Sequence, residues 1–214
     1  MPDIVFYYIN KEVPDYAECC MQSIKKFMPD ATITMLTDKD TPEIEGVDRV
    51  IRKEPKHPVE KASVNYIGYQ YLSDMDINPS VFIDPDMLFN GSIEDIIPGD
   101  YDVAVATRAF GDPVPMQYLI EFPWCSFMVV KNPQFWKDCY EYMCGYDQPD
   151  WTDNMAAVKA MVKSGKYRVK VLDGNIYNVM PLEYRDGVKV YHFKVTDKSG
   201  MRPFWEQYCK GGIQ

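Results

Sequence analysis

The order of apolar runs along the chain predicts alternating strands and helices. Residues 4–9 form a continuous apolar run, which is typical of a strand buried on both faces. Residues 13–27 have a helical pattern, with Pro14 near the start, where its missing N–H breaks no hydrogen bond. Residues 31–36 predict a second strand, and residues 46–51 a short third strand. This order predicts a right-handed β-α-β unit at the N-terminus.

The same alternation continues to the C-terminus. Residues 59–72 have a helical pattern, and residues 110–122, rich in Pro and Gly, predict a loop over a site. The remaining expected elements are strands at residues 81–83, 101–106, 125–130, 167–172 and 188–193, and helices at residues 133–144, 152–165 and 201–210. We find no internal repeat and no linker. We therefore expect one α/β domain over residues 1–214.

The composition indicates a folded globular protein without a membrane span. Hydrophobic residues make up 46% of the 214 positions and aromatic residues 14%. No apolar run approaches the roughly 20 residues that a membrane helix needs, and the N-terminus lacks the pattern of a signal peptide. The 6 cysteines include no C-x-x-C pair, so they predict buried small side chains in a cytoplasmic protein.

The net charge bears on the choice of partner. A formal charge of −9 argues against nucleic acid and against an anionic membrane surface. If the ligand carries phosphate, bound metal and a few local cations must overcome this negative charge.

One stretch combines a buried strand with acidic chemistry. Residues 81–89 begin as an apolar run that is interrupted by Asp84-Pro85-Asp86. Pro85 cannot donate to a strand ladder, so the strand should end there. Carboxylates at the carboxyl end of a buried strand occupy the usual ligand position of open α/β sheets, and they suit Mg²⁺ or Mn²⁺. Asp and Pro are also common in ordinary turns, which is the alternative explanation.

A histidine and several cations follow near the C-terminus. His192 ends the predicted strand at residues 188–193 and could add a nitrogen ligand that favours Mn²⁺ over Mg²⁺. Taken alone, a histidine there is more often a core or surface residue. Lys194, Lys198 and Arg202 follow within a short segment, where they could stabilise charge on a departing diphosphate. A solvated face is the alternative for these cations.

Together these motifs resemble the metal-dependent glycosyltransferases of the GT-A fold, most closely the family of glycogenin and the bacterial lipopolysaccharide galactosyltransferases. Asp84-Pro85-Asp86 matches the Asp-x-Asp of that family. The segment from His192 to Lys198 is similar to its His-Phe-x-Gly-x-x-Lys signature, with Val195 in place of the glycine. Residues 177–181 are similar to its Tyr-Asn-x-x-Pro. A minimal domain of this size could come from a virus or from a larger polypeptide; a viral origin would place the protein in the host cytoplasm.

The resemblance implies a fold, a reaction and a metal site. The fold is a single GT-A domain, a Rossmann-like mixed sheet flanked by helices, with a nucleotide-binding part at about residues 1–90 and an acceptor-side part at about residues 91–214. The reaction is transfer of a sugar from a UDP-sugar to a hydroxyl of a glycan or glycoprotein. Asp84, Asp86 and His192 would hold Mn²⁺ (or Mg²⁺), and Lys198 would bind the diphosphate.

Further residues receive roles from their positions together with the resemblance. Lys61 matches a lysine on the helix before the acidic motif, and Arg202 is a second candidate for the diphosphate. Tyr7 or Tyr8 could stack on uracil; because successive strand residues face opposite ways, we expect only one to do so, and we select Tyr8. Asp38 could accept the imide hydrogen of the base, or it could be a turn residue.

Two acids are candidates for the carboxylate that faces the sugar. Asp153 starts a predicted helix, where an acid is also favoured as a cap, and Asp147 is a rival in the alignment with the family. Either would act as a general base if the configuration inverts, or would orient the sugar if it is retained.

Two other functions remain open at this point. A phosphatase of the haloacid-dehalogenase type also has an Asp-x-Asp at a strand end, but it usually has Thr or Val two residues after the second Asp, where this chain has Leu88. A non-catalytic module that binds nucleotide sugars would keep the fold and the metal site without turnover.

Overall fold

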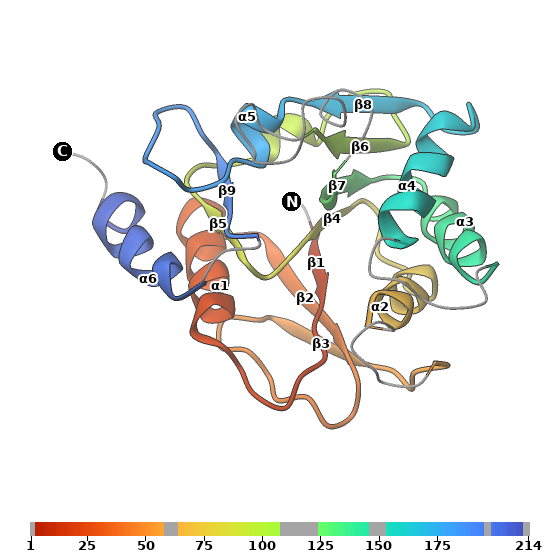
Figure 1. Cartoon of the computed structure of the whole chain (residues 1–214), viewed down its shortest axis with the longest axis horizontal. Coiled ribbons are helices and arrows are strands. Elements are labelled where there is room, and N and C mark those ends of the chain that lie inside the picture. Colours follow the sequence, from red (N-terminus) through yellow and green to blue (C-terminus); the bar gives the residue numbers. More distant parts are fainter. Residues whose placement is uncertain (1–2, 58–63, 108–123, 146–152, 195–197, 212–214) are drawn as a thin grey trace.

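Seven strands form one mixed sheet at the centre of the molecule. The computed structural model describes residues 3–57, 64–107, 124–145, 153–194 and 198–211 (Figure 1). Across the sheet the strand order is β3-β2-β1-β4-β7-β6-β8, and a separate two-stranded sheet pairs β5 with β9. The strands are β1 Asp3–Tyr7, β2 Thr32–Thr37, β3 Arg49–Arg52, β4 Ser80–Ile83, β5 Met87–Phe89, β6 Val103–Ala106, β7 Trp124–Val130, β8 Val169–Leu172 and β9 Val190–His192.

Strand direction divides the sheet into two parts. Strands β3, β2, β1 and β4 run parallel to one another, whereas β7 is antiparallel to both β4 and β6. β8 returns parallel to β6. The expected mixed α/β sheet is therefore confirmed.

Helices cover the sheet on both faces (Figure 1). They are α1 Asp15–Phe27, α2 Val64–Ser73, α3 Gln134–Met143, α4 Asp153–Lys163, α5 Gly174–Tyr177 and α6 Met201–Phe204, with short turns η1 Glu94–Ile96, η3 Lys198–Gly200 and η4 Trp205–Cys209. Side chains alternate between the two faces along β1: Ile4 and Phe6 join a core with α1, and Val5 joins a core with α2 and α3. Both faces are thus buried, as the continuous apolar run predicted.

Most predicted elements are present, with shifts at their ends. α1 begins at Asp15 and Pro14 is its N-cap, so the proline precedes the first turn of the helix. The predicted helix at residues 201–210 is α6 followed by the π-helical turn η4. Among the described residues, no helix is long and apolar enough to cross a membrane. The predicted loop at residues 110–122 and the first part of the predicted helix at residues 59–72, residues 59–63, lie outside the described part.

The second sheet is the main feature that the sequence did not predict. Residues 87–89 continue the apolar run of β4, yet they form β5, which pairs with β9 instead of the central sheet. α1 packs along β5, where Ser23 Oγ accepts a hydrogen bond from Phe89 N at 3.0 Å. The chain therefore leaves the central sheet at the Asp-Pro-Asp turn, which lies between the two sheets.

Candidate metal centre

The Asp-Pro-Asp turn is held by backbone hydrogen bonds on both sides. Asp84 N donates to Ser126 O on β7 at 3.1 Å, and Met87 N donates to Asp84 O at 3.2 Å. Asp86 O accepts from Phe193 N at 3.0 Å, just after β9. Pro85 has no N–H to satisfy, so it fits between these anchored residues. The turn is fixed with one carboxylate on either side of the proline.

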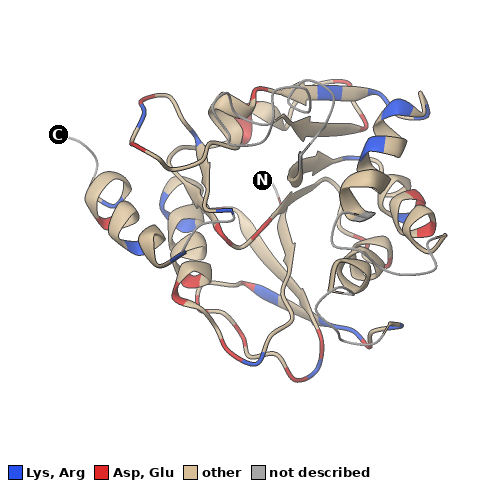
Figure 2. Cartoon of the chain, in the orientation of Figure 1, with Lys and Arg blue, Asp and Glu red and all other residues tan. Residues whose placement is uncertain are grey.

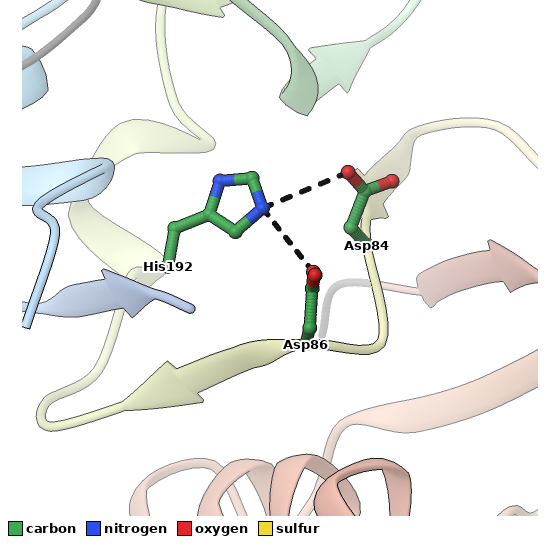
Figure 3. Close-up of side chains that lie close together, drawn as sticks. All are labelled: Asp84, Asp86 and His192. Atoms are coloured by element: carbon green, nitrogen blue, oxygen red, sulfur yellow. Dashed lines mark ion pairs between the residues drawn. The ribbon is translucent and has the colours of Figure 1, made fainter. Parts of the chain in front are cut away.

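Pairing of β5 with β9 brings His192 to this turn. Met87 lies opposite His192 in the antiparallel register. His192 Nε2 is 3.2 Å from Asp86 Oδ1 and 3.8 Å from Asp84 Oδ2 (Figure 3). One candidate ligand atom from each of the three residues lies within 4.8 Å of the others. The predicted convergence of the two carboxylates and the imidazole is confirmed, and the donor set of two oxygens and one nitrogen fits a divalent cation.

Asn178 orients the imidazole from behind. Its Oδ1 lies 2.9 Å from His192 Nδ1, and its Nδ2 donates to Thr107 O at 3.2 Å. The contact with the Thr107 carbonyl identifies the nitrogen end of the amide, so the atom that faces His192 is the oxygen. Nδ1 therefore donates, and Nε2 faces the carboxylates. Both side chains are fully buried. Hydrogen-bonded partners of this kind set the tautomer and orientation of metal-binding histidines.

The two carboxyl groups have opposite electrostatic environments. Burial, followed by the negative charge of Asp86, raises the pKa of Asp84 to about 6. Burial also opposes the ionisation of Asp86, but contact with His192 and Lys198 outweighs it and holds the pKa of Asp86 well below its usual range. Above pH 6 both groups are ionised within a few ångströms of each other. A divalent cation placed between them would relieve this repulsion.

A pocket of about 250 Å³ opens beside the turn, at the carboxyl ends of β1 and β4. Because these strands are parallel, their carboxyl ends meet at the same edge of the sheet. The pocket is lined by Tyr7, Tyr8, Ile9, Val64, Asn65, Asp84, Pro85, Asp86 and Lys198. It thus combines aromatic rings on one side with the acidic turn and a lysine on the other.

Solved structures with the same arrangement of elements are glycosyltransferases. The galactosyltransferase LgtC, solved with donor and acceptor sugar analogues, aligns with a TM-score of 0.58 and 14% identity over 97% of this chain and 91% of that chain. A glycosyltransferase involved in the glycosylation of the major capsid of PBCV-1 aligns with a TM-score of 0.64 and 12% identity over 96% of this chain and 100% of that chain. The glycosyltransferase GlyE of Streptococcus pneumoniae TIGR4 aligns with a TM-score of 0.60 and 13% identity over 100% of this chain and 67% of that chain. This chain has the GT-A glycosyltransferase fold. No protein-family model and no curated protein sequence matches it.

Both N-terminal tyrosines border this pocket. The expectation that only one of them stacks on uracil stays a prediction. Strand alternation still separates their packing, since Tyr7 packs against the core of Val5 and Tyr8 belongs to the core of Ile4 and Phe6. The pocket lies at the carboxyl end of β1, where it borders residues of both faces. Tyr7 stacks on Phe82 with ring centroids 5.6 Å apart and donates to Asn65 Oδ1 at 2.8 Å. Tyr8 is 7% exposed and donates to Glu12 O at 2.9 Å.

The other predicted ligand-binding residues lie in different surroundings. Lys198 borders the pocket and binds Asp86, with Nζ 2.5 Å from Oδ2. Asp38 Oδ1 accepts from the backbone N of Asp40 and of Thr41, so its carboxylate shapes a turn and the predicted contact with the base stays a prediction. Arg202 is paired with Asp15 on α1 at 2.5 Å, and its role at a diphosphate likewise remains a prediction.

Three predicted residues cannot be placed at the site. Lys61 and Asp147 lie outside the described residues. Asp153 is the first residue of α4, but its side chain is not described. The roles of these residues in diphosphate binding and at the sugar stay predictions.

The first testable consequence concerns Asn178. Replacing it with Ala should lower the affinity for Mn²⁺ by about 10- to 100-fold, because His192 loses the partner that fixes its Nε2 lone pair. Isothermal titration of Mn²⁺ into the metal-free protein measures this loss. Asn178→Asp is the control, since it keeps an acceptor at the same place and should retain most of the affinity. An Ala variant that binds Mn²⁺ as tightly as the wild type would show that the hydrogen bond is irrelevant to the metal.

A second consequence concerns Asp84 in the absence of metal. Because the pKa of Asp84 is raised in the folded state, its ionisation opposes folding above pH 6, and this cost fades as pH falls toward the unfolded value of about 3.9. The side chain is 33% exposed, and solvent moderates the cost. Asp84→Asn should therefore raise the free energy of unfolding by about 1–2 kcal/mol at pH 8, and by less at pH 4.5.

Urea unfolding at the two pH values, in excess chelator, measures the effect of Asp84→Asn. Asp74→Asn is a matched control, because Asp74 is exposed and its carboxylate is 3.7 Å from Lys56. A variant that is less stable than the wild type at pH 8 would contradict the assigned cost of the buried charge.

Proposed function

We propose that this protein is a metal-dependent glycosyltransferase that moves a sugar from a UDP-sugar to a hydroxyl of a glycan or glycoprotein. The observation that carries the proposal is the convergence of Asp84, Asp86 and His192 beside a pocket that also contains Lys198 and two tyrosines. The fold supports it, since the similar solved structures are glycosyltransferases.

The donor set supports a specific class of metal. Two carboxylates and one imidazole suit Mn²⁺, and the nitrogen disfavours Mg²⁺ relative to an all-oxygen site. Asp84, Asp86 and His192 would hold this ion. When bound, it supplies Lewis-acid stabilisation of the diphosphate leaving group.

The remaining roles belong to the side chains themselves. In the reaction, the bond from the anomeric carbon to the diphosphate oxygen breaks, a bond to the acceptor oxygen forms, and the acceptor loses its proton. Lys198, with Lys61 and Arg202 as further candidates, would neutralise the departing diphosphate. Tyr8 and Tyr7 would hold the uracil, with Asp38 as a candidate partner for its imide. Asp153, or Asp147 as its rival, would face the sugar and either accept the acceptor proton or orient the donor.

The class of acceptor and the cellular compartment are each proposed from a single observation. The similar PBCV-1 protein is involved in glycosylation of a capsid protein, and this chain covers its whole length, which supports a glycan or glycoprotein acceptor. All 6 cysteines are free, which is consistent with a cytoplasmic enzyme, in the host cytoplasm if the gene is viral. On this proposal the nucleotide-binding part is about residues 1–90 and the acceptor-side part about residues 91–214.

The test is a panel of nucleotide sugars, each added with Mn²⁺, with Mg²⁺ or with chelator. A UDP-sugar that binds the native state should raise the melting temperature only with metal, since ligand at 100 times its Kd adds about 2.7 kcal/mol of stability. The same UDP-sugar should be hydrolysed slowly without acceptor. Stabilisation without any hydrolysis would identify a non-catalytic module, and release of phosphate from an aryl phosphate would identify a phosphatase. Either result would overturn the proposal.

A further inference from the structure

The ammonium of Lys198 occupies one side of the candidate metal centre. Its Nζ lies 2.5 Å from Asp86 Oδ2, while Asp86 Oδ1 faces His192 Nε2 at 3.2 Å. One carboxylate is therefore shared between a cation and the imidazole of the metal centre. The carboxylate of Asp86 is 9% exposed, so water contributes little to its neutralisation.

A second contact holds the ammonium in this position. Lys198 Nζ lies 4.9 Å from the centroid of the Tyr16 ring on α1, a distance typical of a cation–π interaction. Lysine side chains have many rotamers, and a charge-assisted hydrogen bond together with an aromatic face selects one of them. The position on Asp86 is thus stabilised from two directions.

This position matters because the protein is acidic around it. The formal charge of the chain is −9, and Figure 2 shows Lys and Arg interspersed with Asp and Glu in this view instead of forming one basic face. Asp84 and Asp86 place two carboxyl groups within a few ångströms of each other. In the metal-free state Lys198 supplies positive charge at this point. When a divalent cation binds the same carboxylate, the ammonium and the metal repel each other until an anion lies between them.

We propose that Lys198 is the built-in counter-ion of Asp86, and that it keeps divalent metal binding weak until a nucleoside diphosphate arrives to accept its ammonium. The inference rests on the metal site of the proposed function and adds an order to it: metal and diphosphate bind together, and neither binds well alone. By linkage, the factor by which the diphosphate tightens metal binding equals the factor by which the metal tightens diphosphate binding. Lys198 sets much of that factor.

The experiment measures Mn²⁺ binding directly, by the electron paramagnetic resonance signal of free Mn²⁺, with and without UDP. Lys198→Met should bind Mn²⁺ alone about tenfold more tightly than the wild type, a factor within the usual range of coupling between sites. In the same variant, the factor by which UDP tightens Mn²⁺ binding should fall. Lys198→Arg keeps the charge and should resemble the wild type.

Lys189→Met is the matched control. Lys189 pairs with Asp95 at 2.6 Å and is 29% exposed, close to the 35% of Lys198, but it does not border the pocket. It should leave both affinities unchanged, which separates a local effect from the loss of one positive charge in the chain.

The outcomes separate this inference from the proposed function. If the wild type binds Mn²⁺ in a manner that depends on Asp86, but Lys198→Met binds it no more tightly, the counter-ion role is overturned and the metal site stands. If neither protein binds Mn²⁺ with or without UDP, both the counter-ion role and the metal site are overturned. Tighter binding in Lys198→Met and unchanged binding in Lys189→Met support the inference.

Discussion

Asp86→Asn is expected to lower the rate of sugar transfer by about a thousandfold or more while the protein stays folded. The carboxylate of Asp86 contacts both His192 and Lys198, so it links the imidazole to the cation. An amide keeps the shape but loses the negative charge and one acceptor oxygen. Losing a single electrostatic group that acts on the leaving charge costs about 10²–10³ in rate, and losing the metal as well should cost more.

Steady-state transfer with the best UDP-sugar, measured at saturating Mn²⁺, tests this expectation. Thermal unfolding in chelator should show a melting temperature within a few degrees of the wild type, which separates loss of the site from loss of the fold. Asp74→Asn removes an exposed carboxylate that does not border the pocket beside the acidic turn, and it should retain full activity. If Asp86→Asn transferred sugar at close to the wild-type rate, a metal held by this turn could not be part of the reaction.

The parts of the fold that sequence reasoning predicted are those with local signals. β1 and β4 lie in continuous apolar runs bounded by turn residues, and their burial on both faces follows from that pattern. The acidic turn was predictable because Pro85 interrupts such a run. His192 was predictable as a partner only through the resemblance to a family, since nothing in its neighbourhood fixes where β9 lies.

The features that were not predicted depend on pairing across long stretches of chain. β5 was not predicted as a strand, because an apolar triplet after a proline contains no sign that its partner is β9, about a hundred residues later. The contact of Asn178 with His192 has the same origin. The sequence contains the Tyr-Asn-x-x-Pro segment, but only the fold shows that the amide of Asn178 supports the imidazole.

Tyr7 illustrates a different limit. Alternation along a strand assigns one face to each residue, and it correctly separates Val5 from Ile4 and Phe6. The rule also holds for Tyr7, which packs against the core of Val5, and for Tyr8, which belongs to the core of Ile4 and Phe6. It assigns a residue to a face of the sheet, but a pocket at the end of a strand can border residues of both faces, as this one does.

The second large expected effect is on the stability of the protein, and it concerns Gly68, which packs against the pocket residue Tyr7. Gly68→Ala should lower the free energy of unfolding by about 2 kcal/mol. Two effects compete at this position. Alanine favours a helix interior over glycine by about 1 kcal/mol, but a Cβ at residue 68 would lie 2.5 Å from Cγ and Cε1 of Tyr7. Overpacking of a buried site costs about 1–3 kcal/mol and sometimes more.

The clash should win because the Tyr7 ring cannot move away. It stacks on Phe82 at 5.6 Å, and its hydroxyl donates to Asn65 on the same helix as Gly68. Urea unfolding measures the loss. Gly200→Ala is the control, since no atom lies within 4 Å of its added Cβ, and it should change stability by no more than about 0.5 kcal/mol.

A Tyr7→Ala background isolates the cause. Without the ring, Gly68→Ala should become stabilising, by about the 1 kcal/mol of helix preference, because only that effect remains. An equal loss in both backgrounds would mean that the added methyl group meets something other than Tyr7. A change from destabilising to stabilising would instead show that Gly68 on α2 is needed to accommodate the Tyr7 ring, which borders the pocket. The close packing of helix against strand at Gly68 would then be what places an aromatic wall beside the acidic turn.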